Sequence, residues 1–275
     1  MSLDLDDRQR AMLQEMGVHV WLPRPEEAVA QPVPAARPKA SPVQRPVPSS
    51  EATTKPSPRV TPVGSQATAH GAALALQGTD AVDLRAAAIA CQACGLCAGR
   101  KNSTLFMPDV AVQTDWLVLG DPPDVDEDRL GQPFVEQAGT LLDNMLKAVG
   151  ASRSGLGRQG AYLSNVVKCR PPVGRLPQAE DLAQCAQYLR REIELVQPKV
   201  ILAMGRFAVQ LLLEEHPADA ALPLDKQRGR VYRYRGVPVV VSYHPTVLLR
   251  ASANKAKAWT DLCLALDVLE DLPPR

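Results

Sequence analysis

Hydrophobic and polar residues along the last two thirds of the chain follow patterns that predict strands and helices in turn. Short, continuous apolar runs predict buried strands at 116–120, 161–165, 200–204 and 237–243. Between them, apolar residues recur at helical spacing and predict helices at 84–97, 138–149, 178–196, 206–215 and 254–269. Apolar strands that alternate with amphipathic helices are typical of a mainly parallel sheet covered on both faces. The pattern therefore predicts an α/β fold, a three-layer αβα sandwich, with 230–235 as a candidate extra strand.

The first 22 residues have a separate helical pattern. Acidic residues at 4, 6 and 7 precede apolar residues at 11–13 and 16, and Gly17 is placed to end a helix. Because an isolated helix this short is marginal in water, the peptide either packs on the rest of the chain or binds a partner. We expect residues 1–22 to form a short helical peptide.

A proline-rich stretch follows this peptide. Residues 23–62 hold 11 of the 25 prolines, and no aromatic residue occurs between Trp21 and Phe106. Such a composition cannot bury enough apolar surface to offset the entropy lost on ordering. We therefore expect a disordered linker at 23–80 and one folded domain at 81–275.

Charge and hydropathy narrow the choice of function. The 275 residues carry 31 basic and 30 acidic side chains, for a net charge of +1, so any contact with nucleic acid must be confined to a small basic face. No apolar run approaches the roughly 20 residues of a membrane span, and the first residues are acidic where a secretory signal is basic. We expect no membrane contact and a cytoplasmic protein.

The six cysteines all lie at or after position 91, and three of them fall within 91–97. This clustering favours metal ligation in a reducing compartment over a set of disulfides.

Four motifs follow the predicted helix and strand ends. They are the Cys91-x-x-Cys94 pair, the segment from Gly120 to Leu142 with its Gln-Pro-Phe-Val, the segment Asn165-Val-Val-Lys-Cys-Arg-Pro-Pro172 with Cys185, and His244-Pro-Thr-Val-Leu-Leu-Arg250. In parallel sheets, ligands bind beyond the carboxyl ends of the strands. In order and spacing this set resembles the family 4, or iron–sulfur, uracil-DNA glycosylases across residues 85–270. The resemblance implies hydrolysis of the bond between uracil and deoxyribose after the nucleotide is flipped out of the DNA stack.

The resemblance also implies a base-binding crevice. Phe134 would stack on uracil, the backbone at Gly120 would lie against it, and Asn165 would read the pyrimidine edge and reject cytosine. His244 would donate to uracil O2 as the departing base becomes an anion. We expect these distant residues to meet in one crevice.

Two carboxylates complete the implied site. Asp121 stands where the family usually has Glu and would help to hold the attacking water, and Glu127 would lie beside the pocket. Asp124 and Glu136 stand where the family usually has Gly, and Thr246 where it usually has Ser. With Pro122, these departures leave open a catalytically weak or inactive adaptor that binds DNA and replisome proteins.

By the same resemblance, four thiolates would hold a 4Fe–4S cluster with a structural role: Cys91, Cys94, Cys169 and Cys185. Their spacing alone does not exclude zinc. Cys97 is an additional thiol that could compete with Cys94 for a ligand position.

DNA contacts are implied after the last strand. Leu248 and Leu249 would form part of a wedge that fills the gap left by the flipped base, and Arg250 and Lys168 would hold phosphates. A monomer working on DNA, and so associated with the nucleoid, is expected. In addition, residues 8–21 resemble the peptide by which the psi subunit of the bacterial clamp-loader assembly binds chi, which implies a possible replisome partner.

Overall fold

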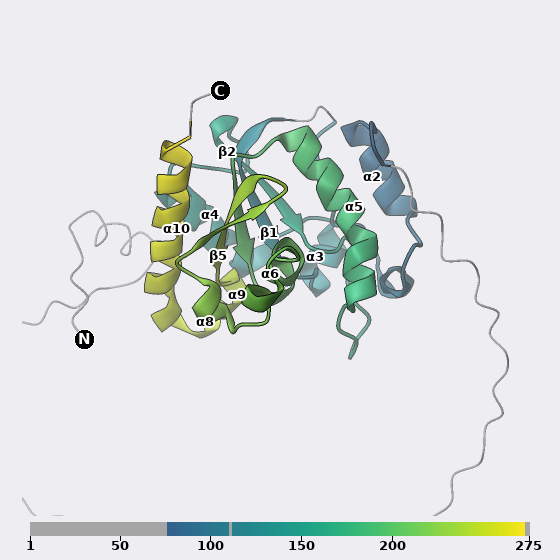
Figure 1. Cartoon of the computed structure of the whole chain (residues 1–275). Coiled ribbons are helices and arrows are strands. Elements are labelled where there is room, and N and C mark those ends of the chain that lie inside the picture. The colour runs from purple at the N-terminus through teal and green to yellow at the C-terminus, as the bar shows by residue number, and fades with distance from the viewer. Residues whose placement is uncertain (1–75, 110–111, 273–275) are drawn as a thin grey trace, which may run out of the picture. The chain divides into compact units, whose positions relative to one another are not determined.

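The computed structural model describes residues 76–109 and 112–272, and it confirms the predicted alternation of strands and helices (Figure 1). The predicted peptide at 1–22 and the linker up to residue 75 lie outside the described residues. The strands are β1 (Thr114–Gly120), β2 (Gly157–Asn165), β3 (Val200–Met204), β4 (Val231–Tyr234) and β5 (Val237–Ser242). The α-helices are α2 (Ala81–Ala90), α3 (Val125–Leu130), α4 (Glu136–Ala148), α5 (Ala179–Val196), α6 (Arg206–Leu212), α7 (Pro217–Ala220), α8 (Leu224–Gln227), α9 (Pro245–Arg250) and α10 (Lys255–Glu270), with 3-10 turns η1 (Gly95–Gly99) and η2 (Ser252–Asn254).

The strands form one sheet in the order β2-β1-β3-β5-β4. The first four strands of that order run parallel, and β4 pairs antiparallel with β5, which confirms the extra strand expected near 230–235. The register pairs Gly120 with Asn165 and Met204 with Ser242. The carboxyl ends of the parallel strands therefore meet along one edge of the sheet, as the motif positions require.

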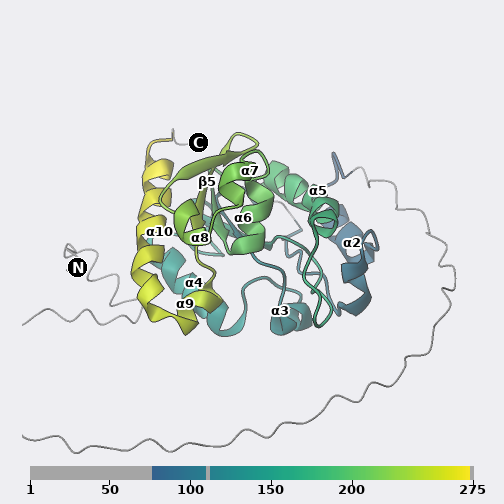
Figure 2. The same cartoon turned by 60° about the horizontal axis from the view of Figure 1, so that its bottom comes forward.

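Each face of the sheet is covered by its own helices (Figure 2). Helices α2, α5 and α6 pack with Leu117, Ile201 and Val239 in one core. Helices α4, α9 and α10 pack with Trp116 and Val240, among others, in a second core on the opposite face. The three-layer αβα sandwich is thus confirmed.

One predicted helix is shorter than expected. The helix expected at 84–97 ends at Ala90, and Cys91 is already extended. Arg100 supplies the reason, because its guanidinium donates to the carbonyls of Ala88 and Ile89 in the last turn of α2. The cysteine pair therefore lies in an irregular segment between α2 and η1 and not on a helix.

The last residues of the expected linker belong with the folded domain. Leu76 is buried, and the carbonyl of Thr79 accepts from Arg191 Nε of α5 at 2.7 Å. Residues 76–80 are therefore held against α5.

A search of the described residues for a helix long and apolar enough to cross a membrane finds none.

Candidate active site

The motif residues gather at the carboxyl edge of the sheet. Gly120 ends β1, and its partner Asn165 ends β2. His244 lies two residues beyond the end of β5, and Phe134 lies two residues before α4 begins. Residues from four separate elements thus converge at the edge where ligands bind in parallel sheets.

The ring of Phe134 packs between Gly120 and His244. A side chain at Gly120 would place a Cβ 2.5 Å from Phe134 Cζ, so the close approach requires glycine. On the other side, the rings of Phe134 and His244 stack with centroids 5.3 Å apart and planes 21° from parallel. Because only 1% of Phe134 is exposed, a base can reach this ring only when neighbouring side chains move.

The backbone of Phe134 is clamped on both sides. Its φ of 52° lies in the left-handed region, which is unfavourable for a bulky residue. Its N–H donates to Glu127 Oε1 at 2.5 Å, and its carbonyl accepts from Arg153 Nη2 at 2.6 Å. Arg153 lies in a loop between α4 and β2 and belongs to no motif, so the sequence alone does not point to it.

The carboxamide of Asn165 is buried and half satisfied. Its Nδ2 donates to the carbonyl of Asp121 at 3.0 Å and to Glu127 Oε1 at 3.2 Å. Since both partners are acceptors, the network fixes which amide atom is the nitrogen. Its Oδ1 is buried and has no hydrogen-bond partner among the described residues. An unpaired buried acceptor is costly, and an N–H donor on a ligand would satisfy it.

Glu127 holds both residues. Its Oε1 serves Phe134 and Asn165, and its Oε2 accepts from the N–H of Asp124 at 2.9 Å. Burial raises the pKa of this carboxyl, while its hydrogen bonds lower it. Asp124 in turn caps α3 by accepting from the N–H groups of Asp126 and Glu127, which completes a capping box.

Asp121 is turned toward α6. Its Oδ1 accepts from the N–H of Phe207 at 2.8 Å. A Cβ at Gly205, where φ is 106°, would lie 2.2 Å from Oδ2, so the carboxylate packs directly over this glycine. Burial raises the pKa of Asp121, and the N–H groups at the start of α6 lower it.

His244 is a neutral ring in this setting. Burial lowers its pKa to about 4, and the charge of Asp124 opposes that shift. Its Nδ1 lies 2.9 Å from Thr246 Oγ1 and accepts from the N–H of Thr246 at 3.4 Å. Because Nδ1 accepts the backbone proton, the ring proton resides on Nε2, which leaves that atom as a donor.

The short helix α9 corrects one predicted DNA contact. Leu248 is fully buried in the second core, so the prediction that it forms part of an exposed wedge is wrong. On either side of it, Val247 and Leu249 are 40% and 43% exposed, and Arg250 is exposed as well. Pro245 and Leu248, three residues apart on α9, face the core, and the helical turn between them leaves Val247 and Leu249 outside.

The position of Lys168 corrects a second predicted DNA contact. Its side chain is 2% exposed, and its Nζ lies 2.6 Å from Glu192 Oε2. The prediction that Lys168 holds a DNA phosphate is therefore wrong, because its charge is used inside the protein.

Five cysteines line a cavity between α2, η1 and α5: Cys91, Cys94, Cys97, Cys169 and Cys185. Arg100 Nη1 donates to Cys169 Sγ at 3.1 Å, and the N–H of Lys168 donates to Cys185 Sγ at 3.3 Å. Such donors stabilise thiolates. Burial raises the pKa of Cys169 to about 11 and that of Cys185 to about 12, although the nearby positive charges lower both.

The sulfur atoms do not form a compact single-ion site. Among the described residues, no group of three or more His, Cys, Asp or Glu side chains is close enough to bind one metal ion. Tetrahedral zinc with bonds of about 2.3 Å requires sulfurs about 3.8 Å apart. The five thiols share one cavity, and hydrogen-bond donors point at two of them.

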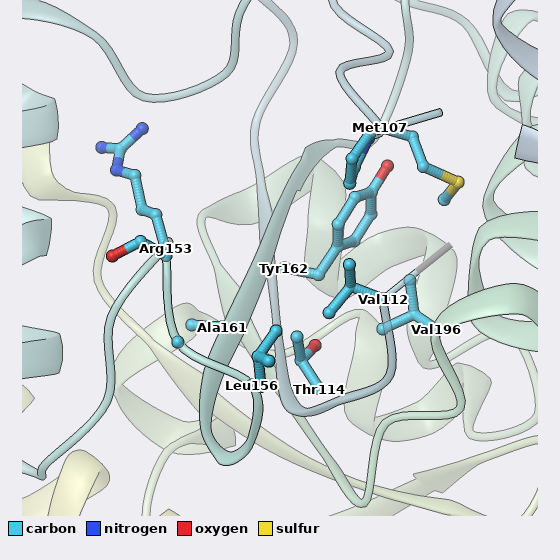
Figure 3. Close-up of a pocket in the computed structure, with 11 residues that line it drawn as sticks. Met107, Val112, Thr114, Arg153, Leu156, Ala161, Tyr162 and Val196 are labelled. Atoms are coloured by element: carbon cyan, nitrogen blue, oxygen red, sulfur yellow. The ribbon is translucent and has the colours of Figure 1, made fainter. Parts of the chain in front are cut away.

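A separate cavity of about 240 Å³ lies near the amino ends of β1 and β2 (Figure 3). Thr114, Leu156, Tyr162 and Val196 lie on its walls, and the guanidinium of Arg153 extends away from it. Arg153 is engaged elsewhere, since its guanidinium donates to the carbonyl of Phe134.

Comparison with known proteins decides the family. Residues 107–263 match the model of the uracil DNA glycosylase superfamily, which is more than half of the chain. The chain belongs to the uracil-DNA glycosylase superfamily. It is 36% identical to a type-4 uracil-DNA glycosylase of Archaeoglobus fulgidus over 58% of this chain and 79% of the relative. A type-4 uracil-DNA glycosylase of Thermotoga maritima is 34% identical over 61% of this chain and 82% of the relative.

A type-5 member of the superfamily matches a smaller part. The type-5 uracil-DNA glycosylase of Pyrobaculum aerophilum is 38% identical over 32% of this chain and 37% of the relative. The matches to type-4 members of the superfamily cover far more of both chains, in agreement with the resemblance to family 4 found in the sequence.

Proposed function

We propose that this chain is a uracil-DNA glycosylase that hydrolyses the N-glycosidic bond of uracil in DNA and so begins base excision repair. The observation that carries the proposal is the buried Oδ1 of Asn165 at the carboxyl edge of the sheet, which has no hydrogen-bond partner in the described part of the chain. Glu127 Oε1 binds both the amide of this residue and the N–H of Phe134. The similarity to proteins named type-4 uracil-DNA glycosylase supports it.

Base selection follows from the fixed amide. The Oδ1 of Asn165 accepts the N3–H of a flipped uracil. Cytosine has no hydrogen at N3 and would leave this acceptor buried and unpaired, a loss that such a site rejects strongly. Phe134 stacks on the ring of the base after the side chains around it move apart.

Cleavage produces an anionic base and an electron-poor sugar. The neutral ring of His244 donates from Nε2 to uracil O2, where negative charge develops, and a donor of this kind contributes about 3 to 4 kcal/mol to lowering the barrier. Water then adds to C1′ of the sugar, where the bond to uracil N1 has broken, and its proton passes to the solvent or to the released uracil anion. Acidic side chains beside the site, Asp121 and Glu127 among them, favour the positive charge on the sugar.

The two acidic residues also hold the site together, Glu127 through its carboxylate and Asp121 through its main-chain carbonyl. Glu127 fixes the Phe134 backbone and the Asn165 amide, and Asp121 offers Asn165 its carbonyl. We therefore assign to Glu127 a positioning role in addition to its charge, and to Asp121 the orientation of water.

DNA is the proposed substrate and partner. Val247 and Leu249 present apolar side chains on α9 that can fill the space vacated by a flipped base, and Arg250 lies next to them for a phosphate.

We also propose a cytoplasmic, nucleoid-associated monomer, and a replisome partner for residues 8–21. A pull-down with residues 1–25 that retains no replisome protein would refute that last proposal.

For the cysteine cavity we propose a 4Fe–4S cluster held by Cys91, Cys94, Cys169 and Cys185, with zinc as the alternative. Cys91 and Cys94 would hold it from the segment after α2, Cys169 from the segment after β2 and Cys185 from α5, and its role there would be structural. Arg100 stabilises the charge of Cys169.

The proposal is tested by base release. Purified full-length chain is incubated with oligonucleotides that carry uracil, cytosine or thymine at one position, and free base is measured by chromatography. We expect uracil alone to be released, and the protein to show the visible absorption of an iron–sulfur cluster. Absence of uracil release would refute the function, and a colourless protein with bound zinc would refute the cluster whatever its activity.

A further inference from the structure

A buried ion pair between Lys168 and Glu192 contacts the main chain of Asn165, the proposed base-reading residue. Lys168 Nζ is 2.6 Å from Glu192 Oε2, and the two side chains are 2% and 0% exposed. Removing two charges from water is expensive, and apolar side chains of similar volume often stabilise a fold equally well. The pair therefore calls for an explanation other than stability.

The ammonium group of Lys168 makes three hydrogen bonds near the end of β2. Besides Glu192, Lys168 Nζ donates to Ser164 Oγ at 2.5 Å and to the carbonyl of Asn165 at 2.9 Å. Glu192 in turn accepts from Tyr162 Oη at 2.7 Å and from Ser164 Oγ at 3.0 Å. Two successive positions on one face of β2 are thus bonded to the carboxylate of Glu192 on α5, and the end of the strand is held to it through Lys168.

The backbone of the same lysine reaches the cysteine cavity. Its N–H donates to Cys185 Sγ at 3.3 Å, and the next residue in the chain is Cys169. Its carbonyl accepts from the N–H of Thr104 at 3.0 Å. Lys168 is therefore bonded at one end to a cysteine sulfur and at the other to the main chain of Asn165.

We propose that Lys168 is a positioning residue that couples the cysteine cavity to base recognition by holding the carbonyl of Asn165. This inference rests on the proposed function. The peptide of Asn165 is fixed by Lys168 and its amide by Glu127, so the direction of Oδ1 depends on both. A change at the cysteines that moves Lys168 would then weaken recognition of uracil without touching the base-binding side chains.

The test uses a double variant in which apolar side chains replace both members of the buried ion pair. Lys168→Met together with Glu192→Leu deletes both charges, whereas Lys168→Met alone would strand a buried carboxylate. The control is Lys199→Met with Asp115→Leu, which removes another ion pair, 3.4 Å long, at the amino ends of the strands. Thermal unfolding and visible absorption first show whether each variant is folded and coloured.

Two measurements follow. One is the single-turnover rate of uracil release, and the other is binding to an oligonucleotide with non-cleavable 2′-fluoro-2′-deoxyuridine compared with its 2′-fluoro-2′-deoxycytidine counterpart, because cytosine lacks the N3–H that Asn165 Oδ1 accepts. We expect the Lys168/Glu192 variant to release uracil at least tenfold more slowly and to lose most of its preference for fluorouridine, with affinity for the cytidine oligonucleotide unchanged. The control pair should retain both properties.

A folded Lys168/Glu192 variant that keeps rate and preference within twofold of the parent overturns the coupling. If that variant does not fold, Ser164→Ala decides, because it removes one partner of the ammonium and keeps both charges. We expect it to lose preference at least threefold, and no loss overturns the coupling. A parent that releases no uracil overturns the proposed function instead.

Discussion

The base-reading residues and the five cysteines belong to one domain, yet they are held by different means. At the sheet edge, the Asn165 amide nitrogen and both sides of the Phe134 backbone have partners within the protein. In the cysteine cavity, Arg100 and the N–H of Lys168 donate to two of the sulfurs, and the segment 91–100 has no long helix or strand. The comparison teaches that contacts within the protein fix the first region on several sides, whereas the second is an irregular segment in which two donors reach the thiols.

The largest effect is expected from the sheet edge. His244→Ala should slow uracil release by about 10² to 10³, because it removes the donor to the developing anion. The measurement is the single-turnover rate with the uracil oligonucleotide. His216→Ala, which changes a histidine outside the site, is the matched control and should leave the rate unchanged. Equal rates for the parent and His244→Ala would remove His244 from the mechanism.

Lowering the pH should reduce the free energy of unfolding through protonation of His244. Burial lowers the pKa of His244 to about 4, against 6.5 for an ordinary histidine, so the unfolded chain binds more protons between these values. The free energy of unfolding should be at its full value above pH 6.5 and fall as the pH drops toward 4. A pKa difference of about 2.5 corresponds to about 3 kcal/mol.

Urea unfolding at several pH values measures this slope in the parent and in His244→Gln. The glutamine variant should lose most of the slope, since it has no imidazole to protonate. If both proteins show the same slope, other groups are responsible for it.

The cysteine cavity should respond to loss of a ligand. Cys185→Ser should abolish the visible absorption and lower the unfolding free energy by about 2 kcal/mol, which corresponds to about 4 to 8 °C in Tm. Cys97→Ser, the control, should leave both unchanged. If Cys97→Ser loses colour and Cys94→Ser does not, the ligand set must be changed accordingly.

The smallest effect concerns Glu136. Its φ of 52° is in the left-handed region, where the family resemblance places Gly. Glu136→Gly should raise the unfolding free energy by up to about 1 kcal/mol, because relief of backbone strain outweighs an exposed ion pair with Arg129. Unfolding in urea tests this, with Glu180→Gly, at a right-handed helical position of α5, as a control that should lose stability.

Much of the architecture could be predicted from the sequence. The apolar strands and the amphipathic helices between them define the layers, and the rule that parallel strands present ligands at their carboxyl ends placed Gly120, Asn165 and His244 on one edge. The resemblance to a known family added Phe134, whose position before α4 no periodicity could have selected.

Each of the three errors has a physical reason that the sequence does not display. Lys168 was expected at the surface because its partner, Glu192, is 24 residues away, so nothing local shows that its charge is neutralised. Leu248 was expected to be exposed because the short helix α9 was not predicted, and only its geometry shows which side faces the core. Arg153 was missed because it acts on backbone carbonyls, which leave no mark on residue types.

The capping box at the start of α3 has a consequence for how this chain is compared with its relatives. Asp124 replaces the glycine usual for the family, and read as a string of letters the change suggests repulsion of the DNA backbone. In the folded protein its Oδ1 is bonded to two amides at the beginning of α3, and the helix it starts carries Glu127, the carboxylate that secures both Phe134 and Asn165. A sequence search that counts Asp in place of this glycine as a sign of lost function would discard proteins in which Asp supports the base-binding pocket.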